Sequence, residues 1–203
     1  MLTAFQNFLY TCALSFDLPI LDWIQANLQS PFMDKFMPFI TVFGDAGIFW
    51  MVISALLVIF PKTRKTGLGM AFAMMIGLVV CNITLKPLVA RIRPYDLQAE
   101  LGVTIQLLGE RMHDFSFPSG HTIASFEAAV VMLKNSKKMG IPAMILAVLI
   151  SFSRLYLYVH YPTDVIASVI LGTLFAIIGH LVAKKLNIPG GPLFRTKKGK
   201  YQA

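Results

Sequence analysis

Two long uncharged runs constrain this chain more than any other feature. Residues 66–85 contain no charged side chain, and residues 165–183 contain His180 as the sole candidate for a charge. A helix needs about 20 mostly apolar residues to span a bilayer. Only 14% of the 203 residues are charged, whereas an ordinary soluble domain has about 25%. The sequence therefore predicts an integral membrane protein.

The distribution of apolar and polar residues predicts an all-α membrane helical bundle with five clear spans. We expect a single domain over residues 1–203, with its motif-bearing core at 45–184. Residues 17–44 mix apolar positions at helical spacing with Asp and Pro, which is typical of two amphipathic helices on the membrane surface. Residues 2–16 are apolar but short, so a short sixth span at the N-terminus is left open. The five expected spans are about 46–61, 66–88, 119–134, 140–159 and 163–184.

The basic residues predict the orientation of these spans. The net charge is +8, but 12 of the 18 basic residues flank the same set of span ends. This bias marks the cytoplasmic side of a multi-pass protein in the plasma membrane, and it argues against a nucleic-acid partner. Residues 188–203 would then form a basic cytoplasmic tail. The twelve are Lys62, Arg64, Lys65, Lys134, Lys137, Lys138, Lys184, Lys185, Arg195, Lys197, Lys198 and Lys200.

The opposite, extracytoplasmic span ends carry side chains suited to binding phosphate. Lys86 and Arg93 bracket the end of the second span, and Arg154 lies near the end of the fourth. Charged residues at the edge of hydrocarbon cost free energy and usually serve a function. Three cations match the charge of about −1.5 to −2 on a phosphate monoester. Arg91 has the same chemistry but no clear place in the set, and we interpret it as an interface anchor.

The start of the third span adds a second group of candidates. Ser119 is expected to cap the helix, and Gly120 allows a ligand to approach the backbone closely. Free N–H groups at a helix N-terminus form a natural anion site. His121 follows directly, and a histidine in the first turn of a membrane helix is rarely structural filler.

A second histidine, His160, lies four residues before Asp164. At this spacing the carboxylate can reach one imidazole nitrogen, fix the tautomer and leave the other nitrogen free as a nucleophile. A purely structural hydrogen-bonded pair is the alternative for these two residues alone. The residues show no carboxylate cluster or His-rich pattern for a metal, and the two cysteines, Cys12 and Cys81, are isolated. We therefore expect neither a metal nor another cofactor.

These residues resemble the signature of the type 2 phosphatidic acid phosphatase superfamily, which also includes vanadium haloperoxidases. The three motifs read Lys86, six residues, then Arg93-Pro94; Pro118 through His121; and Ser153-Arg154, five residues, His160, three residues, Asp164. The resemblance covers about residues 45–184. It implies a six-helix membrane core, an outer-surface site and hydrolysis that needs no metal.

The resemblance also implies a role for each motif residue. His160 would be the nucleophile that forms a phosphohistidine, Asp164 would orient it, and His121 would protonate the leaving oxygen. The implied phosphate-binding residues are Lys86, Arg93, Ser119, Gly120 and Arg154.

The expected function is hydrolysis of a lipid phosphate or pyrophosphate at the outer leaflet, within a membrane of lipids and with no obligate protein partner evident. Undecaprenyl pyrophosphate is favoured because the small chain has little extra structure to read a large head group. A phosphatidylglycerophosphate or phosphatidic acid phosphatase is the alternative. A non-catalytic lipid-phosphate binder or transporter and a vanadate-dependent peroxidase are remoter alternatives. The roles of Glu127 and of the loop at 95–117 are left open.

Overall fold

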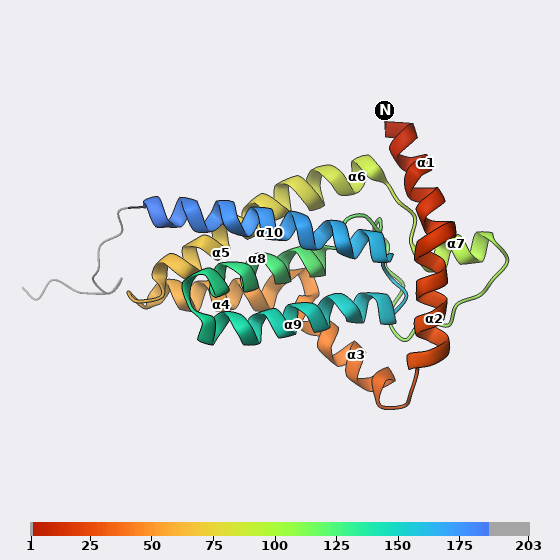
Figure 1. The fold of residues 1–203 in the computed structure, drawn as a ribbon, viewed down its shortest axis with the longest axis horizontal. Helices are drawn as coiled ribbons and strands as arrows, with labels where there is room; N and C mark the ends of the chain where they lie inside the picture. Colours follow the sequence, from red (N-terminus) through yellow and green to blue (C-terminus); the bar gives the residue numbers. More distant parts are fainter. Residues whose placement is uncertain (1, 187–203) are drawn as a thin grey trace, which may run out of the picture.

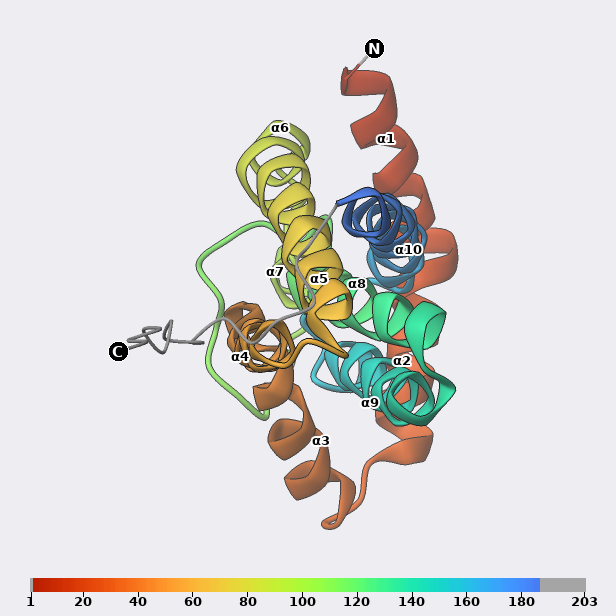
Figure 2. The same cartoon turned by 90° about the vertical axis from the view of Figure 1, so that its left-hand side faces the viewer.

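The computed structural model describes residues 2–186, and this part of the chain is helical without strands. Its centre is a bundle of helices that run roughly side by side (Figures 1 and 2). The expected all-α membrane bundle is therefore confirmed. The bundle helices are α4 (Ile48–Ile59), α5 (Arg64–Gly77), α8 (Gly120–Asn135), α9 (Lys137–Tyr156) and α10 (Pro162–Lys185).

The expected spans match these helices closely. α5 continues through a π-helical segment, η3 (Leu78–Leu85), into α6 (Lys86–Val89), which extends the second span as predicted. Within the described residues, four helical stretches are long and apolar enough to cross a membrane: 33–59, 64–100, 137–156 and 162–185. The fifth bundle helix, α8, has 16 residues and is about 24 Å long at 1.5 Å per residue.

α8 is the central helix of the bundle. It packs against α5, α9 and α10, and most of its side chains are buried, as expected for a helix enclosed by others. Close helix approach at small residues supports the packing around it. A Cβ atom on Gly179 of α10 would lie 2.4 Å from the carbonyl oxygen of Gly69 in α5. Such small-residue contacts replace the hydrophobic driving force that lipid does not supply.

The outer face of the bundle is apolar. On α10, large exposed side chains recur every three or four residues, which places them on one stripe of the helix. An uninterrupted apolar stripe facing outward suits contact with lipid tails rather than water. These side chains are Ile166, Ile170, Leu174, Ile178 and Leu181.

The N-terminal residues form one long helix that lies across an end of the bundle (Figure 1). It comprises α1 (Leu2–Cys12), the π-helical segment η1 (Ala13–Asp17) and α2 (Leu18–Leu28). Because this helix crosses the bundle rather than running along it, a sixth span at 2–16 is not what the structure shows. Residues 2–28 are also not among the stretches able to span.

The amphipathic region expected at 17–44 corresponds to α2 and α3 (Met33–Thr41). α3 leads into α4 through a tight 3-10 segment, η2 (Val42–Gly47). The chain bends sharply there, because Ala46 and Gly47 adopt left-handed conformations with φ of 47° and 68°. The bend turns α3 away from the bundle axis and brings η2 against α8.

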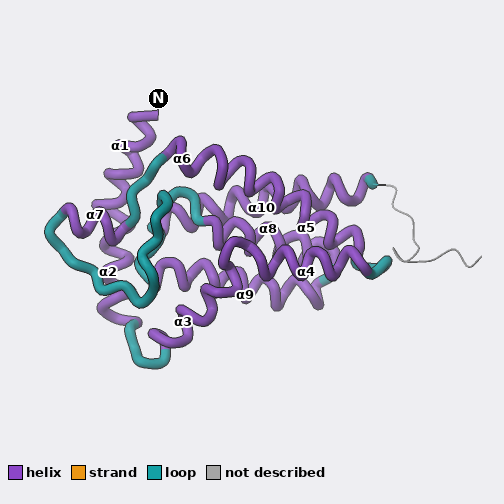
Figure 3. Tube along the Cα trace, turned by 180° about the vertical axis from the view of Figure 1, so that it is seen from behind, coloured by secondary structure: helices purple, strands orange, loops and turns teal. Residues whose placement is uncertain are grey.

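The two ends of the bundle differ. The turns at 60–63 and at Ser136 lie at one end, together with the end of α10 (Figure 1). The other end carries the N-terminal helix, α7 (Pro94–Glu100) and a long loop from 101 to 119 that crosses it (Figure 3). The predicted basic tail at 188–203 lies outside the described residues.

Candidate active site

Three segments that are far apart in the sequence meet at the end of the bundle beneath the long loop. Lys86 begins α6, His121 lies in the first turn of α8, and His160 lies in the turn between α9 and α10. All three line one open cavity of about 730 Å³. The same end of the cavity is also lined by Arg93, Asp114 and Gly120.

From this polar end the cavity continues between α4, α5 and α8. Its wall there is mainly apolar and includes Met51, Val58 and Met74. The buried side chain of Glu127 lies in this part, and its Oε1 has no hydrogen-bond partner among the described residues. The cavity thus joins a cationic mouth to an apolar channel in the membrane-spanning part of the bundle.

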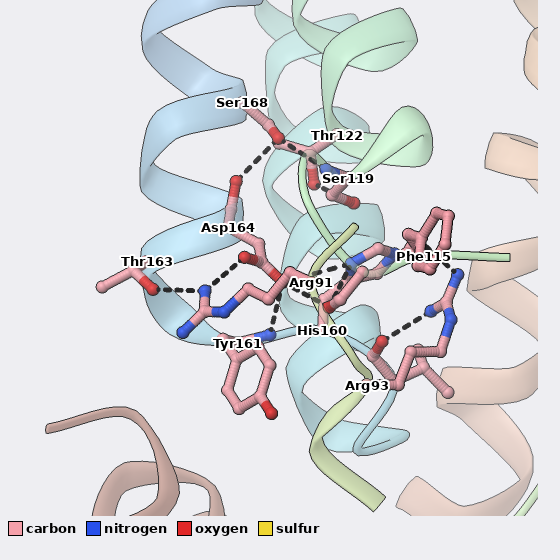
Figure 4. A network of polar contacts seen from close by, with 12 residues as sticks. Arg91, Arg93, Phe115, Ser119, Thr122, His160, Tyr161, Thr163, Asp164 and Ser168 are labelled. Carbon is pink, nitrogen blue, oxygen red and sulfur yellow. Dashed lines mark hydrogen bonds and ion pairs between the residues drawn. The ribbon is translucent and has the colours of Figure 1, made fainter. Parts of the chain in front are cut away.

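His160 is held in a buried polar network (Figure 4). Its Nδ1 lies 3.6 Å from Oδ2 of Asp164 and 3.5 Å from Oγ of Ser116, while the Ser116 hydroxyl donates a 2.5 Å hydrogen bond to the same Asp164 oxygen. The carboxylate therefore faces the imidazole, and the Ser116 hydroxyl lies beside both groups. Burial, together with Arg93 and Arg154, lowers the pKa of His160 to about 3. A neutral imidazole can act as a nucleophile.

His121 is paired with a carboxylate outside the three motifs. Its Nε2 lies 2.7 Å from Oδ1 of Asp45, which stands at the bend between α3 and α4. Gly44 makes this arrangement possible, because a Cβ atom there would lie 2.5 Å from Cδ2 of His121 and 2.8 Å from Cγ2 of Ile150. The bend therefore sets both the space and the partner for the histidine.

Two cations of the first motif share one carboxylate from the long loop. Lys86 pairs with Asp114 Oδ2, and Arg93 Nη2 lies 2.5 Å from Asp114 Oδ1. Arg93 is fixed further by hydrogen bonds to the carbonyl oxygens of Asp114 and Val159. Although burial opposes ionisation, the hydrogen bonds from Lys86 and Arg93 lower the pKa of Asp114 to about 2. The Asp114 carboxylate thus takes the position that a bound anion would need.

The remaining predicted residues stand around the cavity. Arg154, near the end of α9, is buried and donates from Nη1 to Thr41 Oγ1 at 2.6 Å, while its Nε has no hydrogen-bond partner in the described part of the chain. Ser119 precedes α8 but makes no side-chain cap; its N–H donates to Ser168 Oγ at 2.8 Å. Three predicted residues are not among those that line the cavity: Ser119, Arg154 and Asp164.

Arg91 occupies a different place from the one expected. It is buried, and its Nη1 donates to Asp164 Oδ1 at 2.5 Å (Figure 4). Its Nη2 donates to Asp17 Oδ2 at 2.8 Å. The interpretation as an interface anchor is wrong, because two buried carboxylates draw the guanidinium inward instead of letting it reach the lipid surface.

A family comparison identifies the class to which this site belongs. The family model of the PAP2 superfamily matches residues 66–188. The chain belongs to the PAP2 superfamily. The match covers all three groups of predicted residues, whereas the part of the cavity wall that η2 and α4 supply lies outside it.

Named PAP2 relatives cover most of the chain. An undecaprenyl-diphosphatase from Sulfolobus acidocaldarius is 34% identical over 161 residues, covering 79% of this chain and 75% of the relative. A lipid A 4'-phosphatase from Bacteroides thetaiotaomicron is 30% identical over 79% of this chain and 74% of its own length. These PAP2 relatives are named as phosphatases, and this chain is a phosphatase of the same superfamily.

A solved PAP2 structure shares the fold. The crystal structure of a transmembrane PAP2-type phosphatidylglycerolphosphate phosphatase from Bacillus subtilis superposes with a TM-score of 0.70. It is 26% identical and covers 91% of this chain and 95% of that chain. The multi-pass membrane architecture of this chain is therefore shared with a solved member of the PAP2 superfamily.

Proposed function

We propose that this chain is a metal-independent lipid phosphatase that hydrolyses a lipid phosphate or pyrophosphate through a phosphohistidine intermediate. One observation carries the proposal: two histidines and two cations line the mouth of a cavity that continues into an apolar channel. A phosphate group fits the cationic mouth, and a lipid chain fits the channel. The wall of this channel is mainly apolar, and Ser54, Asn82 and Glu127 are polar residues within it.

The proposed reaction has two steps. In the first, an imidazole nitrogen of His160 attacks the phosphorus atom and forms an N–P bond while the P–O bond to the leaving group breaks; His121 gives its proton to the leaving oxygen. In the second, water attacks the phosphohistidine, His121 takes the water proton, and the N–P bond breaks to release phosphate. Asp164 holds His160 in the tautomer and direction required.

The cations would stabilise charge in both steps. A transferring phosphoryl group spreads negative charge over its equatorial oxygens, and fixed cations in a partly dry site stabilise that charge strongly. Lys86, Arg93 and Arg154 supply three such charges, and the buried Nε–H of Arg154 has no hydrogen-bond partner among residues 2–186. The substrate phosphate would displace the Asp114 carboxylate from Lys86 and Arg93.

Undecaprenyl pyrophosphate is the favoured substrate, with phosphatidylglycerophosphate or phosphatidic acid as the alternative. The similarity to an undecaprenyl-diphosphatase supports the first, and the shared fold of a phosphatidylglycerolphosphate phosphatase supports the second. We further propose that the site faces the extracytoplasmic side and the C-terminus the cytoplasm, because the basic links lie at the opposite end of the bundle.

A panel of lipid phosphates, assayed for phosphate release in detergent with EDTA present, tests the proposal. We expect the wild type to hydrolyse undecaprenyl pyrophosphate with the highest kcat/KM. His160→Ala should lose activity by several orders of magnitude, since nucleophile removal costs up to about 10⁶-fold in other hydrolases. His180→Ala, a histidine at the other end of the bundle, is the matched control and should remain active.

The panel has two contrary outcomes. Turnover that survives in His160→Ala would contradict the nucleophile assignment, and activity abolished by EDTA would contradict the metal-independent mechanism. A higher kcat/KM for phosphatidylglycerophosphate would transfer the substrate assignment to the alternative while leaving the chemistry in place.

A further inference from the structure

A buried arginine connects the proposed catalytic carboxylate to the N-terminal helix. Arg91 lies in the extended segment after α6. Its Nη1 donates to Asp164 Oδ1 at 2.5 Å and to Thr163 Oγ1 at 2.8 Å, and its Nη2 donates to Asp17 Oδ2 at 2.8 Å and to the Leu9 carbonyl oxygen at 3.1 Å. Four acceptors from two distant parts of the chain thus hold one guanidinium.

The two oxygens of the Asp164 carboxylate are engaged on different sides. Oδ1 accepts from Arg91, whereas Oδ2 accepts from Ser116 Oγ at 2.5 Å and from the Tyr161 N–H at 3.1 Å. Oδ2 is also the oxygen that faces His160. The orientation of the carboxylate toward the imidazole therefore depends on Arg91 holding the opposite oxygen.

Asp17 holds Arg91 in turn. Its side chain is fully buried at the junction of η1 and α2. Oδ1 accepts from the Thr163 N–H at 2.9 Å, and Oδ2 accepts from both Arg91 and the Thr163 hydroxyl, the latter at 2.7 Å. The Tyr161 ring covers the guanidinium, with its centroid 3.8 Å from Arg91 Cζ. The helix that crosses the bundle end is thereby attached to the first turn of α10.

We propose that Arg91 is a positioning residue for Asp164 and that Asp17 of the N-terminal helix holds Arg91 in place. This inference rests on the proposed function. A carboxylate needs good geometry and satisfied hydrogen bonds to stay ionised in a buried site. A guanidinium forms several directional hydrogen bonds from one rigid plane, so it fixes the direction of two carboxylates together. The N-terminal helix thus acts on the reaction through Asp17, beyond any contact it makes with the membrane.

Three substitutions in the full chain test the link. Arg91→Gln removes the charge, Asp17→Asn removes one carboxylate with little change in shape, and Arg91→Lys keeps the charge but offers a single ammonium. We expect Asp17→Asn and Arg91→Gln to lower kcat about 10- to 100-fold, the range known for second-shell partners of metal-bound histidines, with KM within about threefold. Arg91→Lys should retain more kcat than Arg91→Gln.

The double variant shows whether the two residues act as one link. If Asp17 acts only through Arg91, Asp17→Asn combined with Arg91→Gln should lower kcat no further than Arg91→Gln alone. Arg111→Gln is the control, because Arg111 forms an exposed ion pair with Asp96 on the loop side and should leave kcat unchanged. Thermal unfolding in detergent is measured alongside for every variant.

The proposal is overturned if the variants lower only the unfolding temperature or only raise KM, or if the losses in kcat multiply in the double variant. Asp17→Asn decides the question if Arg91→Gln does not fold. Failure of the proposed function looks different, because His160→Ala would then remain active. Loss of activity in His160→Ala with unchanged kcat in Asp17→Asn would contradict the positioning link alone.

Discussion

At the scale of single residues, the site is built from motif residues and from partners that lie outside the motifs. His121 faces Asp45, the pair of Lys86 and Arg93 shares Asp114, and Asp164 is held by Arg91 and Ser116. Functional groups need such supporting contacts to stay within the geometry that the chemistry requires. The list of motif residues alone is therefore an incomplete description of the site.

Asp114 is expected to compete with the substrate phosphate. Its carboxylate pairs with Lys86 and Arg93, yet about half of the Asp114 side chain is exposed, so it can leave when a stronger anion arrives. In both pairs only the Asp114 carboxylate is well exposed, and ion pairs at a surface contribute roughly 0.2–1 kcal/mol each. Asp114→Asn should therefore lower KM, and the inhibition constant of inorganic phosphate, about two- to tenfold. Steady-state assays with added phosphate measure both values.

The opposite result has a definite meaning. If Asp114→Asn raises KM or leaves it unchanged while kcat falls, the carboxylate arranges the two cations rather than competing for them. Asp96→Asn, at the ion pair with Arg111 on the other side of the loop, is the matched control and should not change KM.

His160 predicts a specific dependence of stability on pH. Its folded pKa is about 3 because it is buried, whereas an unfolded histidine titrates near 6.5. Between these values the unfolded chain binds the extra proton, so the stabilisation is complete above about pH 6.5 and is lost as the pH falls toward 3. Within this range His160 lowers the free energy of unfolding by up to roughly 1.4 kcal/mol for each pH unit of acidification. His160→Gln lacks the titrating group and should not show this loss.

Thermal unfolding in detergent, followed from about pH 7.5 to about pH 4.5, would measure the difference in stability between the wild type and His160→Gln. This range includes the ordinary histidine pKa of about 6.5. The wild type should lose stability more steeply than His160→Gln, and His180→Gln should follow the wild type. Equal slopes for the wild type and His160→Gln would contradict a buried neutral imidazole.

The sequence singles out four residues that the structure brings to one cavity, but it does not single out their partners. Lys86, Arg93, His121 and His160 stand at the ends of apolar spans, where a polar side chain has an evident cost and therefore an evident purpose. Asp114 lies in a loop with several other charges, so no local pattern separates it from solvated neighbours. Asp45 did carry a signal, as a single carboxylate between apolar runs.

At the scale of elements, the bend between α3 and α4 positions His121. Gly44 leaves the space for the imidazole, and Gly44→Ala would place a methyl group 2.5 Å from its Cδ2 atom. The ring or the bend must then shift, which changes the contact between His121 and Asp45. A misplacement of about 1 Å can cost about 100-fold in rate, so we expect kcat to fall by about 10- to 100-fold.

The matched control for this change is Gly109→Ala, because no atom lies within 4 Å of a Cβ placed there. Kinetics of both variants in the same detergent measure the effect. A Gly44→Ala protein with wild-type kcat would show that His121 does not need its observed position.

The sequence predicts the helices that run along the bundle, but it does not predict the direction of the helix that crosses the end of the bundle. The composition of uncharged runs such as 66–85 and 165–183 is enough to predict that they lie in the hydrocarbon core of a membrane. Residues 2–28 are apolar in part, and their orientation depends on the burial of Asp17 against Arg91 and Thr163. That contact joins residues separated by more than 70 positions, which no local periodicity reveals.

At the scale of the whole molecule, we propose that the two bundle ends face opposite sides of the membrane. A single cysteine in place of exposed Gly109, in the loop over the site, should react with a membrane-impermeant maleimide on intact cells. A cysteine in place of exposed Lys137 should react only after permeabilisation. The natural Cys12 and Cys81 are replaced by serine beforehand. The reversed pattern would place the site on the cytoplasmic side.

We propose that the architecture serves one chemical event, the attack of His160 on a phosphorus atom at the cavity mouth. The most direct measurement is rapid mixing with a lipid phosphate carrying a radiolabelled terminal phosphate, followed by an alkaline quench, in which phosphohistidine is stable, and mass spectrometry of the peptides. We predict transient label on the peptide that contains His160, and none in His160→Ala. Label on His121 or another residue, or steady turnover with no labelled protein at any time, would contradict the mechanism.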